Sequence, residues 1–187
     1  MRVIIYPEQQ IQRINRLKNE LEKYSSVSAD ALNKRPNEKA WSALEVMKHI
    51  SMAHNVYSDK MANAFSNSKG NRVKVDELKS SGMMSYLLKR FPPVKGKIKL
   101  KMKTTKVFKP VFEGHHQDPV EIISELNACL DELKSWVESY RTEAISLKKF
   151  NSAIGAIVRL NIPEACEFVL CHGERHFLQI ENTLNAK

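Results

Sequence analysis

Four segments of this chain repeat their apolar residues at intervals of three and four, the spacing that gathers side chains on one face of an α-helix. They begin near residues 7, 42, 118 and 161. Only 6 glycines and 7 prolines occur among 187 residues, which agrees with long helices. The pattern predicts an all-α chain. The four apolar stripes are Ile11, Ile14, Leu17, Leu21 and Tyr24; Leu44, Met47, Ile50, Tyr57, Met61 and Phe65; Ile122, Leu126, Cys129, Leu130, Leu133, Val137 and Tyr140; and Ala165, Phe168, Val169, His172, His176, Ile180 and Leu184.

Helix-capping residues stand where three of the stripes begin. Ser42 and Glu45 form the S-x-x-E capping box, in which each side chain bonds a free backbone N–H of the first turn. Asp118 precedes a proline, which suits a cap followed by the first helical position. Asn161 stands three residues before Glu164 in the same way. These signals predict helices from Ser42 to about Ser66, from Asp118 and from about Asn161.

The region between the second and third stripes has no helical periodicity over roughly 50 residues, apart from a plausible short helix over 76–89. Residues 97–103 alternate lysine with apolar side chains, which predicts an extended segment. Such a long connection suits a crossover between parallel neighbours in a four-helix bundle. We therefore expect one bundle domain over 1–187, with a long crossover between its second and third helices.

The chain carries no apolar run of the roughly 20 residues that a membrane helix needs. Its most apolar stretch, 153–170, is interrupted by charged residues, and its first ten residues are too short for a signal-peptide core. We expect a cytoplasmic protein without membrane contact. Three cysteines, an odd number, suit buried thiols in a reducing compartment. The alternative is a reactive thiol at Cys171, beside His172.

The net charge of +9 is concentrated in one segment, 89–109, which has nine lysines and arginines and no acidic residue. A solvated surface is the favoured interpretation. The first alternative is steering of an anionic substrate or thiol toward a binding site. Nucleic-acid binding is the least favoured, because stacking on bases needs interleaved aromatic residues and only Phe91 and Phe108 lie near the ends of the segment.

Two histidines interrupt the apolar stripe of the last helix. His172 and His176 are four residues apart, so their side chains project from the same face one turn apart. Burying two imidazoles without partners would cost on the order of 1–3 kcal/mol each. Satisfied core histidines are one interpretation. A divalent metal ion shared by both rings is the other, and it requires neutral imidazoles, which a core favours.

His49, at the edge of the buried face of the second helix, supplies a third imidazole. It lies roughly 10 Å from the start of its helix, and the His172–His176 pair lies roughly 12–18 Å from the end of the last helix. If these two helices pack antiparallel, all three imidazoles lie at a similar height along the helix axes. Three nitrogen ligands suit zinc, nickel or ferrous iron, and they leave coordination positions open, as in catalytic sites. We expect His54 at the surface or core edge.

Two motifs resemble the DinB-like superfamily. The first is Arg35-Pro36 followed by Trp41-Ser42, Glu45 and His49; the second runs from Cys166 to Ile180 and has the pattern H-x-x-R-H-x-x-Q-[IL]. The resemblance implies an up-down-down-up four-helix bundle, a metal site at His49, His172 and His176, and frequent homodimers. The lysine-rich segment 89–109 departs from the common pattern of the family.

Relatives in that superfamily include transferases that use low-molecular-weight thiols, and others described as metal-dependent hydrolases. The resemblance therefore implies an enzyme with one divalent ion, zinc or nickel first and iron or manganese next, and a small-molecule substrate. The alternatives are a non-catalytic helical interaction module, or anion or nucleic-acid binding through 89–109.

Two residues beyond the three histidines, Glu45 and Gln179, are candidates for roles at the site. Glu45 could act as a base, although the capping box would occupy its carboxylate. Gln179, three residues after His176, could reach a ligand or the substrate. Glu174 and Arg175 are expected to point sideways, as a pair on the helix surface or at a dimer interface. The two histidines of the loop before the third helix, His115 and His116, are expected to be ordinary loop residues, with a fourth metal ligand as the alternative.

Overall fold

The computed structural model describes residues 2–67, 72–93, 96, 104, 108–112 and 116–186. The chain is mostly helical, as predicted, with small pairs of strands. The predicted extended segment, 97–103, and the candidate fourth ligand His115 lie outside the described residues. The helices are α1 (Pro7–Tyr24), α2 (Ala29–Asn33), α3 (Ala43–Ser66), α4 (Gly82–Arg90), α5 (Pro119–Thr142) and α6 (Ile162–Leu184); the strands are β1 (Ile4–Ile5), β2 (Leu78–Lys79), β3 (Phe150–Ser152) and β4 (Gly155–Leu160).

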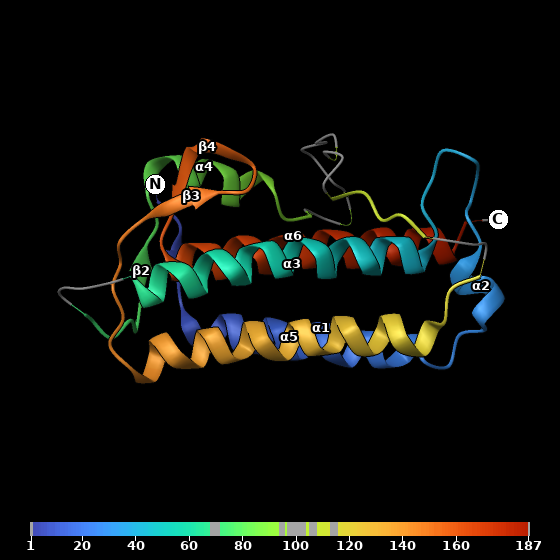
Figure 1. The fold of residues 1–187 in the computed structure, drawn as a ribbon, viewed down its shortest axis with the longest axis horizontal. Helices are drawn as coiled ribbons and strands as arrows, with labels where there is room; N and C mark the ends of the chain where they lie inside the picture. The colour runs from blue at the N-terminus through green and yellow to red at the C-terminus, as the bar shows by residue number, and fades with distance from the viewer. Residues whose placement is uncertain are drawn as a thin grey trace.

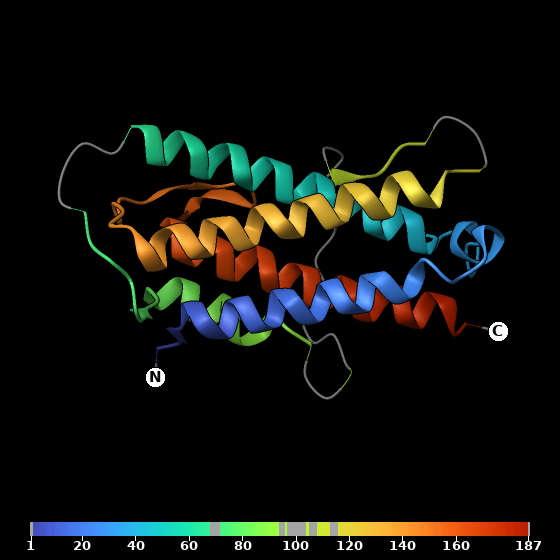
Figure 2. The ribbon, with the colours of Figure 1, turned by 90° about the horizontal axis from the view of Figure 1, so that it is seen from below.

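The four long helices, α1, α3, α5 and α6, lie side by side (Figures 1 and 2). In both views α1 and α6 run in one direction and α3 and α5 in the other. Helix α3 packs on α5 and α6, and α1 packs on the same two helices from the other side. The apolar stripes meet between them, so that Ile14, Met47, Leu126 and Ile180 are each fully buried.

The predicted caps are present at all three helix starts. The Ser42 hydroxyl accepts from the Glu45 amide, while the Glu45 carboxylate accepts from the Ser42 amide at 2.8 Å. Asn161 and Glu164 form the same reciprocal pair at the start of α6. Asp118 accepts from the amide of Val120. The caps therefore fix where α3, α5 and α6 begin.

The expected helix over 76–89 was placed too early, because α4 begins at Gly82. The preceding residues instead form β2, which pairs antiparallel with β1 and places Ile4 opposite Lys79. A strand partner more than seventy residues away is not visible in a local pattern. The short helix α2, in the loop after α1, was also not predicted.

The antiparallel hairpin of β3 and β4 was not predicted either. It places Phe150 opposite Leu160 and turns near Gly155, whose φ of +150° is rarely adopted by residues with a side chain. The hairpin lies with α4 against one end of α3 and α6 (Figure 1). A hydrogen bond of 2.6 Å between the Tyr57 hydroxyl on α3 and the Ser152 hydroxyl ties the hairpin to the long helices.

Within the described part of the chain, no helix is long and apolar enough to cross a membrane. Cys129, Cys166 and Cys171 are free and buried. Burial raises the pKa of Cys129 to about 11 and the pKa of Cys171 well above its usual range. A thiol that stays protonated is a poor nucleophile. This burial favours the interpretation of the cysteines as core residues.

Candidate metal centre

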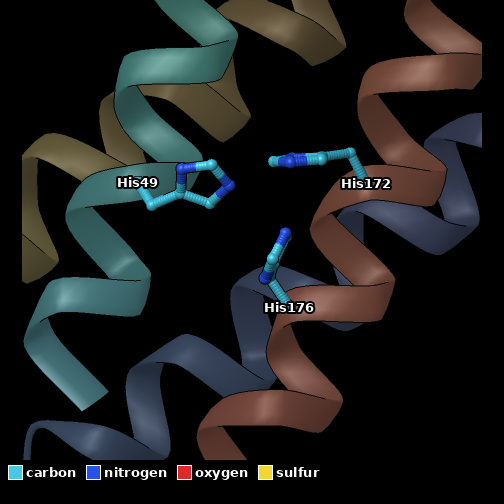
Figure 3. Close-up of side chains that lie close together, drawn as sticks. All are labelled: His49, His172 and His176. Carbon is cyan, nitrogen blue, oxygen red and sulfur yellow. The ribbon is translucent and has the colours of Figure 1, made fainter. Parts of the chain in front are cut away.

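The structure brings together the three histidines that the sequence singled out. His49 comes from α3, and His172 and His176 come from adjacent turns of α6. One nitrogen of each lies within 4.8 Å of the other two. Figure 3 shows the three rings turned toward one common space. The ring centroids are 4.4 to 5.0 Å apart. Two segments more than a hundred residues apart in sequence therefore meet at one point.

Desolvation makes the three imidazoles neutral at pH 7. His49 and His176 are 4% and 9% exposed. Burial lowers the pKa of His49, although its hydrogen bond to a backbone carbonyl opposes this. Burial, followed by repulsion from its neighbours, lowers the pKa of His172 well below the usual range and that of His176 to about 3. Each ring therefore offers a nitrogen lone pair, which metal coordination requires.

Hydrogen bonds orient two of the rings. The Nδ1 atom of His49 lies 2.6 Å from the carbonyl oxygen of Phe108, and Nδ1 of His176 lies 2.8 Å from Oε1 of Gln179. Both oxygens accept, so both Nδ1 atoms carry the proton and both Nε2 atoms carry the lone pair. Metal-ligating histidines commonly donate their other ring N–H to an oxygen in this way.

The donor set fits a divalent ion of intermediate softness. Tetrahedral zinc with nitrogen ligands at 2.0–2.1 Å places those nitrogens about 3.4 Å apart, so small inward shifts of the rings complete the geometry. Three neutral nitrogens suit zinc, nickel or ferrous iron. Three protein ligands would leave at least one position for a small molecule.

A pocket of about 160 Å³ opens beside the three histidines. Its walls come from α3, α6 and the β3–β4 hairpin, together with Phe91 at the end of α4 and with Thr104 and Phe108. Most of the lining is apolar or aromatic, and none of the described lining residues is acidic. The lining residues are His49, Ala53, Tyr57, Phe91, Thr104, Phe108, Ala153, Ile154, Phe168, Val169, His172, Arg175 and His176.

The chain matches a known family. A family profile described as the DinB superfamily matches residues 11–180, which is most of the chain. The chain belongs to the DinB superfamily. Membership and the histidine cluster are each compatible with metal binding. No curated protein and no solved structure matches the chain.

Other candidate residues of this DinB-superfamily chain lie away from the pocket. The Glu45 carboxylate is held by the capping box and by Arg35, whose Nε donates to it at 2.7 Å. His54 is buried, and its Nε2 lies 2.9 Å from the Glu132 carboxylate. His116 has a 67% exposed side chain, 3.7 Å from Asp30. Among the described residues, these side chains add no fourth nitrogen or oxygen to the cluster.

The expectation that Glu174 and Arg175 form a sideways pair was wrong. Glu174 binds Arg13 of α1 at 2.7 Å. Arg175 is 8% exposed and lines the pocket beside His172 and His176. A helical projection places Arg175 at the edge of the buried stripe of α6, one heptad after Phe168. Its guanidinium lies over the ring of Phe91, the residue that follows α4, at 5.3 Å from the ring centre.

Proposed function

We propose that this protein binds one divalent metal ion through His49, His172 and His176 and is an enzyme that transfers a low-molecular-weight thiol to a small substrate. The observation that carries the proposal is the convergence of three neutral imidazole nitrogens at the wall of a pocket. The proposed scaffold is the up-down-down-up four-helix bundle, in which α3 and α6 present ligands at similar depth. Zinc and nickel suit this donor set best, and iron or manganese are the next candidates.

In this proposal the metal ion, the residues that orient its ligands and the aromatic side chains of the pocket have different roles. When bound, the ion would act as a Lewis acid that lowers the pKa of a thiol or water in its open positions. The carbonyl of Phe108 and the amide of Gln179 hold two ligands in a fixed tautomer. Aromatic side chains of the pocket limit the access of water, which strengthens electrostatic interactions inside it.

Thiol transfer is favoured over hydrolysis because hydrolysis at such a centre uses a general base. The described residues that line the pocket include no aspartate or glutamate. Glu45 is committed to the capping box and to Arg35. The Tyr57 hydroxyl is bonded to Ser152, and burial raises the pKa of Tyr57, so it is a poor base. A thiol whose pKa is lowered needs no such residue.

We also propose that the protein is a homodimer and is located in the cytoplasm.

The first test is the metal content of the protein after dialysis against zinc or nickel. We expect one equivalent per chain in the parent. His172→Ala removes one of three ligands and should lower metal affinity at least about a hundredfold. His116→Ala, which removes an exposed histidine, should leave the content unchanged.

The second part of the test follows the consumption of a small thiol and an electrophile by mass spectrometry. The metal-loaded parent should join the thiol sulfur to the carbon of the electrophile, with release of the leaving group and loss of the thiol proton to water, and His172→Ala should form no thioether. A parent that binds no metal, or a His172→Ala variant with full metal content, would overturn the metal site. A loaded parent that hydrolyses esters but never joins the thiol to the electrophile would overturn thiol transfer alone.

A further inference from the structure

Two rows of side chains, one on α3 and one on α6, face each other across the pocket. In each row the residues follow one another at intervals of four, so they leave their helix on the same face. They are His49, Ala53 and Tyr57 on α3, and Phe168, His172 and His176 on α6.

These two rows touch at both ends, because α3 and α6 run in opposite directions. At one end the ring centres of His49 and His176 are 4.7 Å apart. At the other end, next to the β3–β4 hairpin, the ring centres of Tyr57 and Phe168 are 5.6 Å apart. The space between the rows therefore runs from the histidines toward the hairpin.

The space beside the histidines is open because one position in these rows carries no ring. Ala53 follows His49 by one turn of α3, between the two ends at which the rows touch. In a close-packed interior, a ring at the same position would fill the space that this methyl group leaves. A second alanine, Ala153 of the hairpin, lines the pocket from another side. Two small side chains on different elements therefore help to set the size of the pocket.

Aromatic rings form a continuous wall along this space. The centre of the Phe168 ring lies 4.8 Å from that of Phe91 and 5.6 Å from that of Tyr57. The Phe91 ring in turn stacks on His172 at 6.1 Å with an angle of 19°. Aromatic rings prefer stacked or edge-to-face neighbours, so this wall suits a flat ring.

Four polar side chains of the described lining already have partners. The Tyr57 hydroxyl is bonded to Ser152, and Nδ1 of His49 and of His176 each lie within hydrogen-bond distance of an oxygen of the protein. Arg175 is not free either. An ionised group on a ligand would lose its hydration here and would have to displace one of these interactions, which is unfavourable. The described lining therefore favours an uncharged ligand.

The volume of the pocket, about 160 Å³, indicates the size of such a ligand. An apolar protein cavity of about 150 Å³ holds one benzene molecule. We propose that this pocket binds an uncharged, flat apolar ring of about that size and that Ala53 is the residue that admits the ring beside the three histidines. The inference rests on the proposed function and names the substrate class of the same site, a small electrophile whose reactive carbon is attached to such a ring.

The first experiment titrates the metal-free protein with fluorobenzene and, separately, with para-fluorobenzoate, and follows each by fluorine NMR. The metal-free form is used because a bound ion would itself attract the carboxylate. We expect fluorobenzene to bind about tenfold or more tightly than para-fluorobenzoate, whose charge would be desolvated. Equal affinities, or a preference for para-fluorobenzoate, would overturn the proposal of an uncharged ligand.

Three variants test which residues admit the ring. Ala53→Leu places a larger apolar side chain in the space beside His49 and should lower the affinity for fluorobenzene at least about tenfold. Leucine is a good helix former, so α3 should persist. Ala62→Leu makes the same change at an exposed position of α3 and should keep the affinity of the parent. A folded Ala53→Leu variant that binds fluorobenzene as the parent does would overturn the role of Ala53.

Ala153→Leu narrows the pocket from the hairpin and should also weaken the binding of fluorobenzene. This variant carries the test if Ala53→Leu does not fold. Affinity retained in a folded Ala153→Leu variant would show that the ring binds outside this pocket.

The last measurement places the ring relative to the metal site. Cobalt(II), a paramagnetic ion that histidine nitrogens also bind, is loaded in place of zinc. It should increase the fluorine relaxation rate of bound fluorobenzene above the rate in the zinc form. An unchanged rate with cobalt bound would overturn the substrate proposal while the metal site stands. A parent that binds neither ion would overturn the proposed function, and the metal-free titrations would still decide whether the pocket holds an apolar ring.

Discussion

At the scale of single residues, burial sets the protonation state of four histidines: His49, His54, His172 and His176. Desolvation lowers the pKa of each, and for His54 this effect outweighs the neighbouring Glu132 carboxylate. In the unfolded chain the same residues titrate near pH 6.5. As the pH falls below that value, the unfolded chain therefore binds protons that the folded protein does not.

This difference predicts that the metal-free protein loses stability in mild acid. The free energy of unfolding should be nearly constant between about pH 7 and 8. Below about pH 6.5 it should fall by about 1.4 kcal/mol per pH unit for each histidine that stays neutral in the fold. His176→Gln should reduce this slope by about 1.4 kcal/mol per pH unit, the contribution of one proton. Urea unfolding at several pH values measures it; a stability independent of pH between 7 and 5 would contradict the assignment of neutral buried histidines.

The convergence of three histidines was predictable from the sequence because His172 and His176 interrupt an apolar stripe and His49 lies on the edge of another. The burial of Arg175 was not predictable, because Arg175 lies at the edge of its stripe and the Phe91 ring beneath its guanidinium comes from a region without helical periodicity. The acceptor for His49 is a backbone carbonyl, that of Phe108, and every residue has one. The amino-acid type at position 108 therefore gives no signal that its carbonyl accepts from His49.

At the scale of elements, a buried polar network joins α1 to α6 behind the histidines. Arg13 donates to Glu167 at 2.6 Å and to Glu174 at 2.7 Å, and Gln10 donates to Glu167 at 2.9 Å. Burial opposes the charge of Arg13, but the two carboxylates outweigh this and raise its pKa. The network fixes the position of α6, and with it the position of two of the three imidazoles.

Arg13→Met should therefore destabilise the protein by about 3 kcal/mol or more, because it leaves the buried Glu167 carboxylate without its charge partner. Arg141→Met is the matched control, since Arg141 pairs with Glu138 at the surface of α5 and both side chains are over a third exposed. It should have no measurable effect. Chemical denaturation of both variants measures their free energies of unfolding. Similar values would show that the network does not hold α6 in position.

The long helices were predictable as elements because their stripes and caps are local features. The starts at Ser42, Asp118 and Asn161 follow from side chains within three positions of each cap. The β1–β2 pair and the β3–β4 hairpin were missed for a different reason. Strands β1, β2 and β3 have only two or three residues each, too few to establish an alternating pattern. Strand β4 has six residues, but its Ala-Ile-Val run does not alternate apolar with polar side chains.

At the scale of the whole molecule, the mostly helical class and the DinB superfamily were predicted correctly from the sequence, and the profile match over residues 11–180 agrees. The pocket could not be predicted, because five separate parts of the chain build it. Helices α3 and α6 supply the histidines, and α4, the hairpin and residues near Phe108 close the other sides.

The central claim is that one metal ion joins α3 to α6 at the three imidazoles. A crystal of the zinc-loaded protein, with diffraction recorded on both sides of the zinc absorption edge, tests this most directly. We predict a single strong anomalous peak about 2.0–2.1 Å from one nitrogen each of His49, His172 and His176. A zinc peak only at another position, or no peak beside these three rings under saturating zinc, would contradict the claim that they hold one metal ion.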